Sequence, residues 1–219
     1  MSGKVLSIAT VYLIYLRFLN IRHPNYIRGM VRGVLGLDVS CSSTGWVLLS
    51  NTGRVLKCGA VPAARLSVMD AALKVSGEIL GELADTPCSH WSIGIEDYLK
   101  HAGGPSWTTK SLFKLAEMNA MMRVLMFKAL AAVPEPIPAR TARAMFGLNA
   151  GERSRTGNKE IKEIVLRFAE PFVSPVYAWE LKRTGRVKDH CYDIADAFVI
   201  ARYKWATMEE SIPLPEDSP

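Results

Sequence analysis

Four acidic residues lie inside or directly beside three strongly apolar segments, and this placement limits what the chain can fold into. The acids are Asp38 in VLGLDV, Glu96 at the end of WSIGIE, and Asp193 and Asp196 in DIADAFVIARY. A buried carboxylate without a partner either costs free energy or stays protonated. One such residue is explained by a helix cap, as Asp193 could be. Acids on three separate apolar segments favour a shared site.

The spacing of these acids allows them to meet. Asp193 and Asp196 are three residues apart and so share one face of a helix. Asp38 and Glu96 end apolar strands, and the ends of neighbouring strands lie ~5 Å apart. Converging carboxylates repel one another unless cations lie among them, and oxygen-only ligands suit Mg²⁺ or Mn²⁺. Two such ions about 4 Å apart serve phosphodiester hydrolysis, so the pattern predicts a two-ion site.

The order of the apolar segments predicts an α/β fold. Three antiparallel strands are expected first, over 34–39, 46–49 and 54–61. Further strands are predicted over 91–96 and 133–138, and helices over 66–84, 108–132, 159–169 and 190–205. We therefore expect a mixed five-stranded sheet with helices on both faces. The prolines of 133–138 place that strand at an edge, and the methionines of 108–132 are expected to fill the core.

The chain has 219 residues, which suits one domain, expected over 31–207. The acid-free, Arg-bearing stretch 1–30 is typical of an organellar presequence, so we predict a mitochondrial location. A first helix of the fold is the alternative for this stretch, and an intracellular soluble protein is the alternative location. Its apolar run is shorter than the ~20 residues that cross a bilayer, so no membrane partner is expected. Residues 208–219, acidic and proline-rich, are expected to be a solvated tail.

The charge balance permits a polyanionic partner. The chain holds 27 Lys and Arg against 21 Asp and Glu, a net charge of +6. Eleven of these cations lie between Arg140 and His190, against six acids. A local excess between the predicted catalytic elements suits a groove that follows a nucleic-acid backbone. The loop from Lys100 to Lys110, which carries Trp107, suits contact with a junction or with bases; packing of this Trp on the core is the alternative.

In these motifs the chain resembles the RuvC-type Holliday junction resolvases of the ribonuclease H-like superfamily. GLDVSCSSTGW resembles the first-strand acid and the Ser/Thr-rich turn of that family, IGIED resembles its fourth-strand glutamate, and DIADAFVIA resembles its C-terminal D-x-x-D-A helix. The similarity runs from about Val34 to Tyr203. PARTAR is similar to a segment that ends in a basic residue, here Arg143. GNKEIKEIV is similar to the next helix start, so Lys159 matches the basic residue near the scissile phosphate.

The chain departs from the family pattern in two places. The segment LNAGERSRTG is longer than expected, and its Arg153 and Arg155 could add phosphate contacts. The family tends to carry an aromatic residue three positions after the glutamate. That position is Leu99 in this chain, with Tyr98 beside it.

The resemblance implies a homodimer in which each subunit nicks one strand of a four-way DNA junction during recombination or repair. Two Mg²⁺ or Mn²⁺ ions would be held by Asp38 and Asp196, with Glu96 and Asp193 completing the shell. Lys159 would offset the charge that develops on the phosphate. The nucleic-acid contacts expected from the motifs and the basic loops are Tyr98, Lys100, Trp107, Lys110, Arg143, Arg153, Arg155 and Lys159. The long helix 108–132 is the expected dimer surface.

Three other functions compete with junction cleavage. A RuvC-like protein could bind structured RNA without cutting it, for example during assembly of an organellar ribosome. A YqgF-type nuclease of ribosomal RNA processing has a similar first strand, but the D-x-x-D-A helix favours the RuvC side. Sugar kinases and actin-like ATPases need two such domains, and 219 residues are too few.

Overall fold

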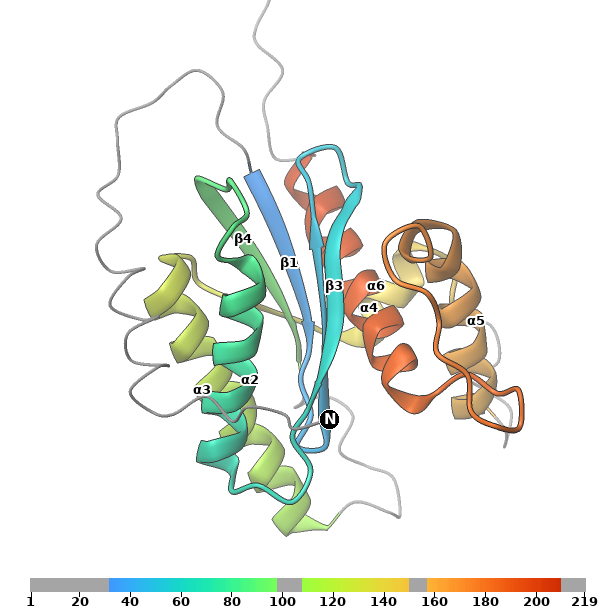
Figure 1. Cartoon of the computed structure of the whole chain (residues 1–219), viewed down its shortest axis with the longest axis horizontal. Coiled ribbons are helices and arrows are strands. Elements are labelled where there is room, and N and C mark those ends of the chain that lie inside the picture. The colour runs from blue at the N-terminus through green and yellow to red at the C-terminus, as the bar shows by residue number, and fades with distance from the viewer. Residues whose placement is uncertain (1–31, 98–107, 150–156, 210–219) are drawn as a thin grey trace, which may run out of the picture.

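The computed structural model describes residues 32–97, 108–149 and 157–209. They form one five-stranded sheet with helices on both faces (Figure 1). The predicted α/β architecture is therefore confirmed. The predicted leader over 1–30 and nearly all of the predicted tail over 208–219 lie outside the described residues.

The sheet combines an antiparallel meander with parallel strands. Its strands are β1 (Arg32–Asp38), β2 (Ser43–Leu49), β3 (Val55–Pro62), β4 (His90–Glu96) and β5 (Glu135–Ile137). Their order is β3-β2-β1-β4-β5. β1 pairs antiparallel with β2 and parallel with β4, and β4 pairs parallel with β5. The strand with the prolines is thus at an edge, as predicted.

Helices cover each face of the sheet in a separate layer (Figure 1). One layer holds α2 (Val68–Leu83) and α3 (Thr109–Leu130), and the other holds α4 (Ala139–Met145), α5 (Gly157–Val173) and α6 (Asp189–Glu209). The sequence did not predict α4, because seven residues after a proline are too few to show a helical period. No described helix is long and apolar enough to cross a membrane.

Each layer buries its own apolar cluster against the sheet. Phe198 of α6 is fully buried in one cluster. The other cluster contains Met118, Met122 and Met126 of α3, all fully buried, so these methionines fill the core as predicted. β1 alternates between the clusters, with Val34 in the first and Leu35 in the second. A strand buried on both faces must be apolar throughout, which explains the composition of β1.

Two glycines let α6 pack directly on the sheet. A Cβ atom on Gly36 of β1 would lie 2.3 Å from the carbonyl oxygen of Ala197, and one on Gly45 of β2 would lie 2.0 Å from that of Asp193. Any side chain at these positions would push the helix away. The first two turns of α6 therefore lie against the end of β1.

Candidate active site

The four predicted acids come from three elements that meet at one end of the sheet. Asp38 ends β1 and Glu96 ends β4. These strands are parallel neighbours in which Leu37 pairs with Ile95, so the next residues of the two strands are adjacent. Asp193 and Asp196 lie in the first two turns of α6, and both carboxylates act electrostatically on Asp38. The structure thus places the other three acids within electrostatic range of Asp38.

The environment of Asp38, Asp193 and Asp196 opposes the ionisation of these three side chains. Burial raises the pKa of Asp38 well above its usual range, and the charges of Glu96, Asp196 and Asp193 raise it further. Asp38 also shares a hydrogen bond with the Glu96 carboxyl. Burial raises the pKa of Asp193 as well, against the opposing effect of the Ser43 hydroxyl. The fold has gathered like charges where water screens them poorly.

Arg143 enters this cluster from the last turn of α4. Its Nη2 atom lies 2.9 Å from Oδ1 of Asp196, and the two side chains are 20% and 14% exposed. Burial raises the pKa of Asp196, and Arg143 opposes that rise. For Arg143 itself, burial disfavours the charge, but the carboxylates of Asp196, Glu96 and Asp38 outweigh it and raise the pKa. Among the described residues, Arg143 is thus the cation that forms an ion pair with an acid of the cluster.

Lys162 is a second cation near the acids, and the sequence analysis did not single it out. Its charge opposes the rise in the pKa of both Asp193 and Asp196, and its Nζ atom lies 5.9 Å from the centre of the Tyr192 ring. The predicted Lys159 belongs to α5 one turn earlier, but its side chain is outside the described part of the structure. The spacing of three residues from Lys159 was the available signal for Lys162.

A buried asparagine ties the long helix to the site. Asn119 of α3 is 2% exposed, and its Nδ2 donates to the carbonyl oxygen of Glu96 at 2.9 Å. The backbone N–H of Asp97 donates to the carbonyl of Ile137 at 2.9 Å. Both bonds fix the end of β4, where Glu96 stands. The available signal for Asn119 was one polar side chain in the buried stripe of a helix.

The structure leaves most of the predicted nucleic-acid contacts undescribed. Lys110 is exposed at the start of α3. Arg143 points into the carboxylate cluster. The predicted contacts that lie outside the described residues are Tyr98, Lys100, Trp107, Arg153 and Arg155.

The carboxylate oxygens of the cluster are suitable ligands for a hard divalent cation, but they are not arranged around a common metal position in the described residues. Among the described residues, no group of three or more His, Cys, Asp or Glu side chains is placed to hold a metal ion. Asp196 is bonded to Arg143, and Asp38 shares a hydrogen bond with Glu96. The donor set is nevertheless made of carboxylate oxygens alone, which Mg²⁺ and Mn²⁺ prefer.

The likeness of this chain to solved structures lies in its fold. RuvC of T. thermophilus, solved in complex with a Holliday junction substrate, superposes with a TM-score of 0.51. The match covers 82% of this chain and 96% of that chain at 14% identity. The fold is ribonuclease H-like. No protein-family model and no curated protein matches the sequence.

Proposed function

We propose that this protein is a metal-dependent endonuclease that hydrolyses phosphodiester bonds in branched DNA, with the four-way junction as its substrate. The observation that carries the proposal is the convergence of Asp38, Glu96, Asp193 and Asp196 from β1, β4 and α6 on a ribonuclease H-like sheet. Buried like charges destabilise a fold, and such clusters mark functional sites. The resemblance of the sequence motifs to junction resolvases supports the choice of substrate.

In this proposal the four carboxylates hold two Mg²⁺ or Mn²⁺ ions. Such ions activate the attacking water and stabilise the leaving oxygen. Each of the other three acids acts electrostatically on Asp38, so we assign Asp38 as a ligand of both ions. Arg143 occupies Oδ1 of Asp196 and would compete with an ion for this carboxylate. In this proposal the guanidinium of Arg143, at the edge of the cluster, contacts the substrate phosphate.

Two lysines of α5 serve the phosphate in this proposal. The charge of Lys162 reaches Asp193 and Asp196, so a phosphate bound at these acids lies within its electrostatic field. Lys159, one turn earlier, is assigned the role of offsetting charge that builds up during cleavage.

We also propose that two copies associate through α3. Three large apolar side chains of this helix are exposed: Phe113 at 71%, Val124 at 53% and Phe127 at 49%. They lie along one stripe of the helix, since at about 100° per residue the spacings of eleven and three residues keep them within roughly 60° of one another. A second copy would remove this stripe from water. The mitochondrial location stays a prediction that rests on 1–30.

Cleavage of a synthetic four-way junction in Mg²⁺ or Mn²⁺ tests the proposed function. The wild-type protein should nick the junction, and Asp38→Asn should reduce nicking by about a thousandfold or more, since a ligand of both ions is lost. The same variant should still bind the junction, because Asp38 is assigned to the ions and not to contacts with the DNA. Asp85→Asn, an exposed acid outside the cluster, is the matched control and should cleave normally.

The possible outcomes separate the competing functions. Binding without any nicking by the wild-type protein would contradict the nuclease and favour the structured-RNA binder. That binder would then prefer folded RNA over the DNA junction in competition. Equal loss of cleavage and binding in Asp38→Asn would contradict the assignment of this acid to the ions.

A further inference from the structure

A short hairpin joins α5 to α6 and leads directly into the helix that carries two of the acids. Leu181 and Val187 form an antiparallel bridge. The backbone N–H of Lys188 donates to the Glu180 carbonyl at 2.8 Å, and Gly185 closes the turn with φ of +77°. The hairpin, residues 180–189, is therefore an ordered element with a fixed base.

The base of the hairpin is neutralised by a compact network around one carboxylate. Glu180 accepts from Nζ of Lys188 at 2.6 Å and from the Tyr177 hydroxyl at 2.9 Å, and Nε2 of His190 lies 3.2 Å from it. The hydrogen bonds from Lys188 and Tyr177 lower the pKa of Glu180 to about 2. Glu180 thus stays ionised and holds the base of the hairpin together.

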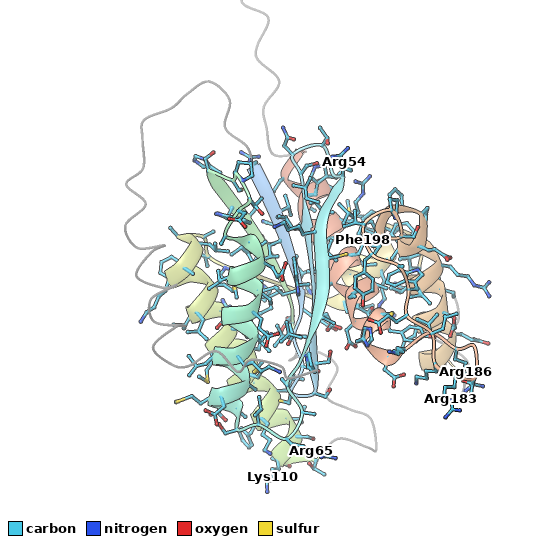
Figure 2. The ribbon with its side chains drawn as sticks, in the orientation of Figure 1. Arg54, Arg65, Lys110, Arg183, Arg186 and Phe198 are labelled. Atoms are coloured by element: carbon cyan, nitrogen blue, oxygen red, sulfur yellow. The ribbon has the colours of Figure 1, made fainter. Side chains whose placement is uncertain are left out.

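The tip of the hairpin, residues 183–186, carries two arginines that no described acid pairs with. Lys182 pairs with Asp189 at 2.8 Å. Arg183 and Arg186 are exposed, and neither forms an ion pair within the part of the chain that the structure describes. Residues 180–189 hold four Lys or Arg and two acids, so the excess of two positive charges corresponds to these two arginines. Figure 2 shows both pointing away from the ribbon.

The tip lies within reach of a nucleic acid bound at the carboxylates. From Asp189 to Asp196 the helix rises ~10 Å. The three residues from Arg186 to Asp189 add at most ~10 Å. The Cα atom of Arg186 is thus within about 20 Å of that of Asp196, or roughly six base pairs. In Figure 2, Lys110 lies toward the same end of the molecule as Arg183 and Arg186, and Arg54 lies at the opposite end.

We propose that the hairpin 180–189 is a phosphate-binding arm that contacts the nucleic-acid backbone beside the cleaved position through Arg183 and Arg186. The inference rests on the proposed function for its ligand, a nucleic acid. The guanidinium group binds phosphate through paired hydrogen bonds, and an arginine without a carboxylate partner needs no bond broken to do so. The neutralised base fixes the direction of the arm, and the unpaired tip supplies its affinity.

Binding of a labelled four-way junction, measured by fluorescence anisotropy over a range of salt without added divalent cations, tests the arm. The double variant Arg183→Ala/Arg186→Ala should bind about tenfold more weakly, and its slope of log K against log salt should fall by about two. Arg54→Ala, an exposed arginine at the opposite end, is the matched control and should change neither quantity. The double variant should unfold at the wild-type temperature, because the tip is exposed.

A second variant and the wild-type baseline make the failures distinguishable. Arg183→Lys/Arg186→Lys keeps both charges and should keep the salt slope near the wild-type value. If the wild-type protein binds and the double alanine variant matches Arg54→Ala, the arm is refuted and the proposed function stands. If the wild-type protein binds neither junction nor duplex, the proposed function itself fails.

Discussion

The carboxylate cluster and the base of the hairpin use acidic side chains in opposite ways. At the cluster, burial and neighbouring acids raise the pKa of Asp38, and one arginine forms the ion pair with Asp196. At the hairpin, a lysine and a tyrosine lower the pKa of the exposed Glu180 to about 2. Glu180 has Lys188 and His190 beside it, whereas the four acids of the cluster share one ion pair, with Arg143. The uncompensated charge is what a bound cation would satisfy.

The largest expected effect on stability comes from removing the arginine that pairs with Asp196. Without divalent cations, Arg143→Ala should lower the free energy of unfolding by about 3 kcal/mol, because it leaves Asp196 buried without its partner. Added Mn²⁺ should restore part of the loss by replacing the missing charge. Denaturant unfolding at pH 7 measures both effects. Arg167→Ala, an exposed arginine of α5, should have little effect, and equal stability of the two variants would contradict the assigned pairing.

The second prediction separates rate from affinity. Lys159→Ala should lower the nicking rate by about a hundredfold, because a charge near the reacting phosphate acts mainly in the transition state. Its dissociation constant for the junction should stay within about twofold. Single-turnover cleavage and anisotropy measure the two quantities. Substitution of Arg183 and Arg186 should instead weaken junction binding and leave the nicking rate of bound junction unchanged. Weaker binding without a slower rate in Lys159→Ala would contradict the assignment of Lys159 to the active site.

The third prediction uses pH to compare the two regions. A carboxyl whose pKa is raised by folding destabilises the folded state as pH rises above the unfolded pKa, near 4. Asp38→Asn should therefore increase the free energy of unfolding by about 1–3 kcal/mol at pH 7. The increase should shrink to about 0.4 kcal/mol near pH 4, where the acid is protonated in the folded state and half protonated in the unfolded state. Unfolding curves at the two pH values check this, and an unchanged increase at pH 4 would contradict it.

The smallest expected effect loosens the hairpin. Glu180 has a lowered pKa, so its contribution to stability is present above pH 4.5 and is lost as pH falls toward 2. Glu180→Gln should speed hydrogen exchange of the Lys188 amide and weaken junction binding about twofold, since the arm is less fixed. Cleavage of bound junction should be unchanged. Exchange at the wild-type rate would show that backbone bonds alone hold the base.

Much of the fold could be predicted because its signals are local. Continuous apolar runs identified β1 and β4, and prolines identified the edge strand β5. The same runs exposed the acids, since Asp38 and Glu96 interrupt a pattern that a buried strand would otherwise keep apolar. Their convergence follows from parallel pairing of neighbouring strands, which the order of the elements implies.

The remaining features depend on contacts between distant parts of the chain. The pairing of Arg143 with Asp196 joins residues 53 positions apart, and no spacing rule connects them. The role of Gly45 appears only when α6 lies against β2. The hairpin is short and polar, so it carries no apolar period, and the counts of its charges do not show which are paired.

Isothermal titration calorimetry, with Mn²⁺ titrated into the metal-free protein, tests the central claim most directly. We expect saturable binding by the wild-type protein, loss of that binding in Asp38→Asn, and tighter binding in Arg143→Ala, because the competing guanidinium is gone. Asp85→Asn should bind as the wild-type protein does. Equal Mn²⁺ affinity in the wild-type protein and in Asp38→Asn would contradict the claim that these acids form a cation site.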